Sequence, residues 1–149
     1  MAGVSLPEFP EGKEFEEYIS ALLQAGGYYV ERNIIDRKGT EVLELDIITT
    51  DYSNRLPNVR LFEVKSTEWH FSDLFKVRGW MDYLKLKNAA FIAKGSRDSF
   101  ERFEEIAKVL EIAPVIIDKI ENSKTCLAGL IQQNNSSDID VCTFQKIDC

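Results

Sequence analysis

Cysteine and histidine are scarce in this 149-residue sequence, which contains three cysteines and one histidine. Cys126, Cys142 and Cys149 all lie near the C-terminus, without the paired short spacing of a zinc site or a disulfide framework. We therefore expect neither and interpret the cysteines as core or surface thiols. We interpret the single histidine, His70, as an exposed or helix-capping residue rather than a general base.

Long apolar runs are also missing, and none approaches the roughly 20 residues that are needed to cross a bilayer. The first residues, MAGVSLPEFPEGKEFEE, show no basic segment followed by an apolar one, so we expect no secretory signal. The content of 44% hydrophobic and 29% charged residues is typical of a globular protein, and the length suits one domain. We expect a single domain over residues 1–149, located in the cytoplasm and not in a membrane.

Basic residues are in the minority, and the net charge of -7 argues against a general nucleic-acid coat protein, which relies on clustered Lys and Arg. The charge is unevenly distributed, because basic residues outnumber acidic ones between Arg60 and Arg97. The flanking segments carry the acidity. This middle segment is therefore the part of the chain suited to meet an anionic partner.

The apolar spacing predicts alternating helices and strands. Helices are expected over 14–25, from 72 or 73 to about 86, and from 96 or 98 to about 110. Strands are expected over 28–33, 41–51, 59–66, 88–93 and 115–118, with a turn at 36–39 and a loop at 52–58. This order predicts an α/β fold with a mixed central β-sheet flanked by helices. We place the core at about 12–118 and a C-terminal extension at 119–149, with a loop at 132–138 and a last strand at 139–144.

The stretch LFEVKSTEW places Glu63 and Lys65 in an alternating strand pattern with Phe62 and Val64. Side chains two positions apart on a strand share a face, at a separation of about 6.5 Å. One face therefore presents a carboxylate beside an ammonium group. Taken alone, the pair fits a solvated strand face with cross-strand charge pairing better than it fits a catalytic site, and only the residues around it reverse that order.

Asp46 lies in the preceding strand among Leu43, Leu45, Ile47 and Ile48, where an unpaired carboxylate is costly to desolvate. If the two strands form a hairpin, Asp46 and Glu63 converge on one divalent metal ion, with the carbonyl of Val64 as a third oxygen ligand. A few hard oxygen ligands that leave room for water suit Mg²⁺ or Mn²⁺.

These segments resemble the PD-(D/E)xK nuclease superfamily, which has a restriction-endonuclease-like core. The segments that carry the resemblance are GKEFEEYISALLQAGGYYV for the first helix, LELDII and FEVKS for two strands, KVRGWMDYL for the next helix and NAAFIA for the strand after it. They look like Mrr-type restriction enzymes and archaeal Holliday-junction resolvases over roughly residues 12–96. Leu45 stands in place of the proline in the family's name, and the chain after Pro114 has no counterpart.

The resemblance implies that Asp46 and Glu63 bind the metal and that Lys65 positions or activates the attacking water. It also implies that Glu16 touches the metal through water, although acidic residues in a first helical turn are also ordinary partners of the helix dipole. The residue types fit the chemistry, since phosphodiester hydrolysis needs a cation that polarises the phosphoryl oxygen and a positive group near the nucleophile.

Aromatic and basic residues interleave in the helix expected after the FEVKS strand. Lys76, Arg78, Trp80 and Tyr83 suit stacking and phosphate contacts along a nucleic acid. They suit core aromatics and a solvated helix face just as well. Because this basic stripe is modest, we expect weak, salt-sensitive DNA binding, aided by a homodimer or a larger complex.

The hypothesis that these observations favour is a metal-dependent nuclease that acts on nucleic acid, with DNA expected as the substrate. A second hypothesis is a catalytically silent nuclease-fold module that binds nucleic acid or a protein partner. A third is a small assembly or regulatory domain whose acidic flanks meet a basic partner.

Overall fold

A computed structural model describes residues 10–53, 55–96 and 100–135. The helices are α1 (Lys13–Ala25), α2 (Phe71–Leu84), α3 (Glu101–Val109) and α4 (Ser123–Asn135), with a short 3₁₀ turn, η2 (Ile120–Asn122), before α4. The strands are β1 (Tyr29–Lys38), β2 (Thr40–Asp51), β3 (Asn58–Lys65), β4 (Asn88–Lys94) and β5 (Ala113–Ile117).

The described strands form one five-stranded sheet in the order β1-β2-β3-β4-β5. β1, β2 and β3 pair antiparallel as a meander, whereas β3, β4 and β5 pair in parallel. The parallel pairs are connected by α2 and α3, since parallel neighbours need a crossover connection. The predicted α/β fold with a mixed sheet and flanking helices is thus confirmed.

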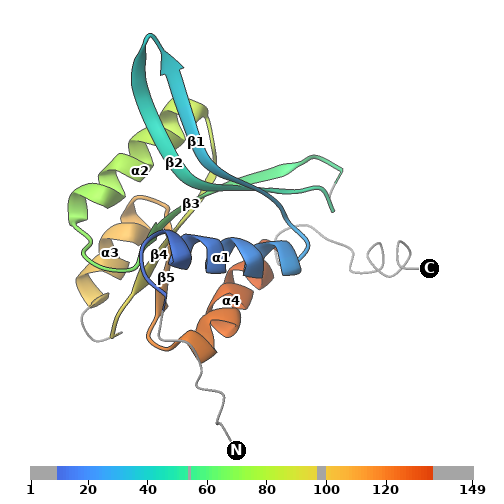
Figure 1. Ribbon diagram of the computed structural model, residues 1–149, viewed down its shortest axis with the longest axis vertical. Coiled ribbons are helices and arrows are strands. Elements are labelled where there is room, and N and C mark those ends of the chain that lie inside the picture. Colours follow the sequence, from blue (N-terminus) through green and yellow to red (C-terminus); the bar gives the residue numbers. More distant parts are fainter. Residues whose placement is uncertain (1–9, 54, 97–99, 136–149) are drawn as a thin grey trace, which may run out of the picture.

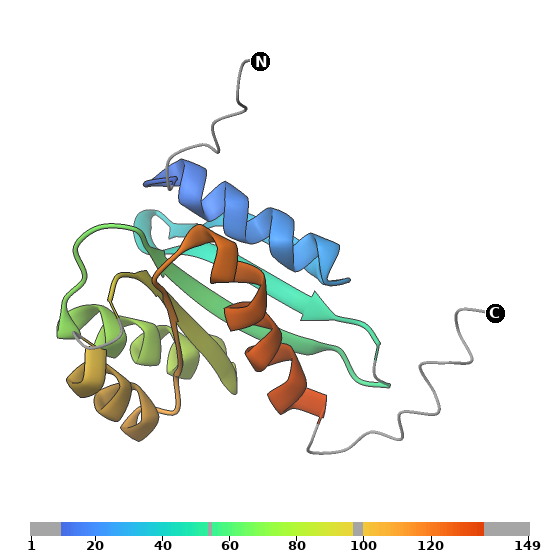
Figure 2. The same cartoon turned by 90° about the horizontal axis from the view of Figure 1, so that it is seen from below.

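The helices cover both faces of the sheet (Figures 1 and 2). On one face, Phe15 and Ile19 of α1 and Leu127 and Leu130 of α4 share a core cluster with Phe62. On the other face, α2 and α3 pack on the sheet, with Leu74, Val77, Met81, Phe103 and Ala107 buried there. Neighbouring residues of β3 therefore point into different layers, with Leu61 in one cluster and Phe62 in the other.

The β1–β2 hairpin is longer than the sequence predicted. The expected turn at 36–39 is wrong for most of its length, because pairing continues from Tyr29↔Thr50 to Lys38↔Thr40. Only Gly39, with a φ of 81°, adopts the left-handed conformation of the turn. Ile34 and Asp36 instead pair with Leu45 and Leu43, which adds an arm to the sheet (Figure 1).

The start of α2 also differs from the prediction. The sequence predicts Ser72 or Asp73 as the residue that caps this helix, but the N-cap is His70. Asp73 lies in the first turn, where its Oδ2 accepts a hydrogen bond of 2.8 Å from the backbone N–H of His70. The interpretation of His70 as a capping residue is therefore confirmed, and Asp73 serves the cap from inside the helix.

The C-terminal region contains a helix that the sequence pattern did not reveal. Residues 132–135, expected in a loop, belong to α4, whereas the strand expected at 139–144 lies outside the described residues. The predicted C-terminal extension contributes to the core as far as Leu130. Among the described residues, no helix is long and apolar enough to cross a membrane.

Candidate active site

The predicted carboxylates meet where β2 and β3 separate. Pairing of these strands runs from Asp51↔Asn58 to Ile47↔Phe62 and ends there. One step further, the backbone N–H of Val64 donates a hydrogen bond of 2.9 Å to Oδ2 of Asp46. The Asp46 side chain thus takes the place of a backbone acceptor and lies in the gap between the strands.

Glu63 is almost fully buried, with 2% of its surface exposed. Its Oε1 lies 3.4 Å from Nζ of Lys65 and 3.3 Å from Nζ of Lys76, which belongs to α2. Its Oε2 is buried and has no hydrogen-bond partner among the described residues. Burial and the negative charge of Asp46 raise the pKa of Glu63 to about 7, in spite of the two lysines.

Asp46 is half-buried, and burial raises its pKa above the ordinary value. The Val64 hydrogen bond and the charges of Lys65 and Lys76 act in the opposite direction. The negative charge of Asp46 in turn raises the pKa of Glu63, as expected of two carboxyl groups that lie near each other. A cation between two such carboxyl groups would attract both and offset their mutual repulsion.

Lys65 remains a cation in this setting. Although burial alone would lower the pKa of Lys65, the charges of Glu63 and Asp73 raise it above its ordinary value. A protonated ammonium group cannot accept a proton at neutral pH. The geometry therefore suits Lys65 to orienting a water or an anionic oxygen rather than to removing a proton.

Glu16 lies in the first turn of α1, on the side of Asp46. Partial burial and the negative charge of Asp46 raise the pKa of Glu16. The start of α1 is tied to the end of β3, because the N–H of Gly12 donates to Oγ of Ser66 at 2.7 Å. This tie explains how a helix far away in the sequence reaches the site.

The donor set fits a hard divalent cation with an incomplete protein shell. No group of three or more His, Cys, Asp or Glu side chains within the described residues could hold a metal ion. Glu16 is therefore not a third carboxylate that binds the ion directly. The N–H and C=O of one strand residue point to the same side, which directs the Val64 carbonyl toward Asp46. Two carboxylates, one carbonyl and water suit Mg²⁺ or Mn²⁺, and the unpartnered Oε2 of Glu63 is a vacant acceptor.

The four α2 residues expected to contact nucleic acid have partners within the protein. Lys76 reaches Glu63, and its Nζ lies 4.8 Å from the ring centroid of Trp80, which packs against the core. Arg78 donates to the carbonyl of Leu110 at 3.1 Å and pairs with Asp82, and the Tyr83 hydroxyl donates to Asp36 at 3.2 Å. Their role in nucleic-acid binding stays a prediction.

Lys76 is the site residue whose place the sequence analysis missed, since it was assigned only to a nucleic-acid surface. The available signal was the short connection between β3 and α2, which forces the first turns of α2 past the end of β3. Leu74 and Val77 on either side of Lys76 are buried, so this part of the helix had to lie close to the sheet.

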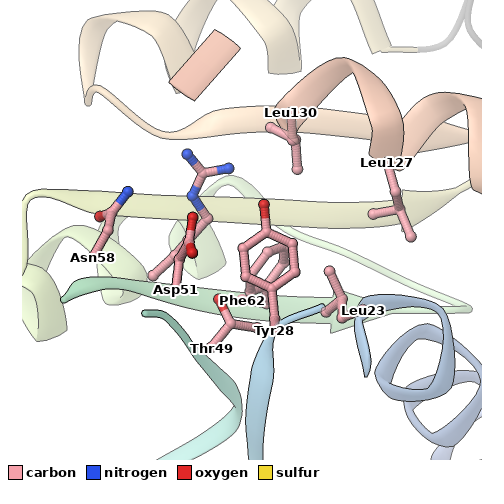
Figure 3. Close-up of a pocket in the computed structure, with 9 residues that line it drawn as sticks. Leu23, Tyr28, Thr49, Asp51, Asn58, Phe62, Leu127 and Leu130 are labelled. Carbon is pink, nitrogen blue, oxygen red and sulfur yellow. The ribbon is translucent and has the colours of Figure 1, made fainter. Parts of the chain in front are cut away.

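A small pocket lies at the opposite end of the β2–β3 pairing (Figure 3). It is lined by Leu23, Tyr28, Thr49, Asp51, Asn58, Arg60, Phe62, Leu127 and Leu130. Leu127 and Leu130 extend from α4 toward Tyr28 and Phe62. Arg60 is largely buried, and burial lowers its pKa. None of the predicted site residues lines this pocket.

Comparison with known protein families finds no match, and no curated protein is detectably similar to the chain. The crystal structure of a protein of unknown function, AF1548, aligns with a TM-score of 0.53 at 11% identity, over 72% of this chain and 59% of that chain. The MspJI restriction endonuclease in complex with a 27-mer oligonucleotide gives a TM-score of 0.40 at 14% identity, over 91% of this chain and 32% of that chain. The first likeness concerns the fold alone, and the second is too remote to bear on function. The chain spans less than two thirds of the length of either neighbour.

Proposed function

We propose that this chain is a metal-dependent nuclease that hydrolyses phosphodiester bonds, with DNA as the substrate. The observation that carries the proposal is the meeting of Asp46 and Glu63 at the separation of β2 and β3, with one buried Glu63 oxygen unpartnered among the described residues. Burying two interacting carboxylates this way is unfavourable for folding. A functional requirement for both accounts for their retention.

Each residue has a distinct role in this proposal. Asp46, Glu63 and the Val64 carbonyl would hold Mg²⁺ or Mn²⁺, and Glu16 would orient a water in the outer shell. The bound ion supplies Lewis acidity and lowers the pKa of its water. Lys65 holds the attacking water and the phosphoryl oxygens in place through its ammonium group, since its raised pKa keeps it charged.

The substrate class is proposed from charge. The segment between Arg60 and Arg97, which has an excess of Lys and Arg, contains Glu63 and Lys65 of the site, whereas the chain as a whole is acidic. A polyanion is therefore attracted to this segment more than to the rest. Lys76, Arg78, Trp80 and Tyr83 are the proposed contacts on α2, and a homodimer or a larger complex would extend the limited basic surface.

A direct test is to incubate labelled single- and double-stranded DNA with the protein and Mg²⁺ or Mn²⁺, with EDTA as the control. Asp46→Asn should lower the cleavage rate by roughly 10²-fold or more, because it removes a carboxylate that holds the ion. Asp51→Asn is the matched variant, since Asp51 lies on the same strand outside the site. Metal-dependent cleavage that survives Asp46→Asn unchanged would exclude this site.

One observation favours the silent nuclease-fold module as a second candidate. Lys65 and Lys76 both form ion pairs with Glu63, so positive charge already lies beside the carboxyl groups without any metal. Such a module would bind DNA with equal affinity in EDTA and in Mn²⁺, with no calorimetric signal for Mn²⁺ itself. Titration of the protein with Mn²⁺ therefore separates the two candidates.

A further inference from the structure

Lys76 occupies an unusual position between three groups. Its Nζ lies 3.3 Å from Oε1 of Glu63, 3.8 Å from Oδ1 of Asp73 and 4.8 Å from the ring centroid of Trp80. The side chain is 43% exposed, whereas that of Glu63 is 3% exposed. Lys76 therefore reaches from the surface of α2 to a buried carboxylate.

The same Glu63 oxygen receives two ammonium groups. Lys65 approaches Oε1 at 3.4 Å and Lys76 at 3.3 Å, while Oε2 has no hydrogen-bond partner within the described part of the chain. A buried carboxylate beside a second one needs nearby positive charge. Lys76 supplies positive charge from α2 and is free to move away, whereas Lys65 is fixed on the same strand as Glu63.

We propose that Lys76 is an exchangeable counter-ion of the site, which neutralises Glu63 without metal and turns to substrate phosphate when a divalent cation binds Glu63. The inference rests on the proposed function and adds a residue that couples metal binding to substrate binding. Asp73 and Trp80 give the displaced ammonium group a second place at the edge of the site.

The two lysines differ in their freedom to leave. Lys65 is two residues from Glu63 on a paired strand, so its ammonium group stays beside the carboxylates. Lys76 projects from a helix on a long flexible side chain and already contacts Asp73 and Trp80. A cation at Glu63 repels both ammonium groups, and Lys76 is the one with another favourable position.

This exchange has a measurable consequence of unexpected sign. Removing Lys76 should strengthen metal binding in the absence of DNA, because the ion no longer competes with an ammonium group for Glu63. It should at the same time reduce the gain in metal affinity that DNA provides, since no Lys76 ammonium group is left to move from Glu63 to a phosphate. A lysine that only contacted DNA would leave the metal affinity of the free protein unchanged.

The test is calorimetric titration of Mn²⁺ into the full chain, the Lys76→Met variant and the Lys87→Met variant, each with and without a short DNA duplex. Met keeps the apolar part of the lysine side chain. Lys87 is an exposed lysine just beyond α2, so Lys87→Met removes the same net charge as Lys76→Met. We expect Lys76→Met to bind Mn²⁺ on the order of tenfold more tightly without DNA, and Lys87→Met to match the unmodified protein. Lys76→Gln provides a second variant if Lys76→Met does not fold.

The outcomes separate the inference from the proposed function. Mn²⁺ binding that requires Asp46 but has the same or a weaker affinity in Lys76→Met and Lys76→Gln would overturn the inference and leave the nuclease proposal standing. Equal tightening in Lys87→Met would also overturn it, because the effect would then come from net charge. Absence of Mn²⁺ binding in the unmodified protein and in every variant would overturn both.

Discussion

The two ends of the β2–β3 pairing both contain buried charge, but they treat it differently. At one end Asp46 and Glu63 lie together, and Glu63 Oε2 is buried without a hydrogen-bond partner among the described residues. At the other end Arg60 lines a pocket together with Asp51 and Tyr28. Leu127 and Leu130 of α4 extend toward Tyr28 in this pocket (Figure 3).

This comparison shows that buried charge by itself does not identify a functional site. The Arg60 end combines charges of opposite sign and is covered by Leu127 and Leu130, as expected of a structural cluster. The Glu63 end brings two carboxyl groups together beside the ammonium groups of Lys65 and Lys76, and it reaches solvent through these lysines, which are 31% and 43% exposed. The unfavourable pairing and the access distinguish the candidate site.

The largest expected effect is found by comparing the basic residues near the two ends of β3, Lys65 and Arg60. Lys65→Met should reduce metal-dependent DNA cleavage about 10²- to 10³-fold, because it removes the positive group beside the reacting phosphate. Arg60→Met should leave the cleavage rate per folded molecule nearly unchanged. Rates are measured well below the melting temperature, and equal losses in both variants would remove the functional distinction between the two ends.

The next effect concerns the cover over the Arg60 end. Leu127→Ala should lower the free energy of unfolding by about 2 to 4 kcal/mol, since Leu127 is 4% exposed in the core cluster. Val109→Ala is the control, because Val109 is 82% exposed and its loss should change stability little. Urea denaturation measures both variants. An unchanged free energy of unfolding for Leu127→Ala would show that α4 does not cover the core.

Replacing Glu63 should raise the stability of the metal-free protein, whereas replacing Leu127 should lower it. Its pKa of about 7 in the folded protein exceeds the ordinary value of 4.5, so the folded state binds this proton more tightly than the unfolded state. The free energy of unfolding of the metal-free protein should therefore fall as pH rises from about 4.5 to 7. Glu63→Gln removes this dependence and should stabilise the protein at pH 8 by about 2 kcal/mol.

Urea denaturation in EDTA at pH 5, 6.5 and 8 measures this difference. Glu31→Gln, at an exposed position of β1, should give a curve parallel to that of the unmodified protein. If the curve of Glu63→Gln also runs parallel to that of the unmodified protein, ionisation of Glu63 does not destabilise the fold.

The smallest effect compares adjacent tyrosines. Tyr28 lines the Arg60 pocket, and burial followed by the charge of Asp51 raises the pKa of its hydroxyl. Tyr28→Phe should cost about 1 kcal/mol of stability, whereas Tyr29→Phe should cost almost nothing because Tyr29 is 56% exposed. Thermal melting resolves the pair, and a larger loss for Tyr29→Phe would contradict the arrangement at this end.

The strands that carry the site were predictable because their residues alternate. Glu63 and Lys65 fall on one face by the period of a strand, and Asp46 was conspicuous among apolar neighbours. The hairpin required only that two consecutive strands pair. These are local properties, which sequence patterns record well.

What the sequence left open depends on contacts between distant elements. Apolar residues are few in α4, and this helix is stabilised by the packing of Leu127 and Leu130 on the sheet. The contact of Lys76 with Glu63 depends on how α2 crosses the end of β3, which no periodicity specifies. The neutralisation of the site therefore became visible only in three dimensions.

The hydrogen bond from Val64 to Asp46 spans 18 residues of sequence, and the contact from Lys76 to Glu63 spans 13. The entropy lost in closing a loop grows with its length, so these contacts need only short stretches of chain to come together. We therefore expect the charged cluster to assemble early in folding, ahead of the longer-range docking of β5 and α4. The chemistry would then be in place while the opposite end of the sheet is still open.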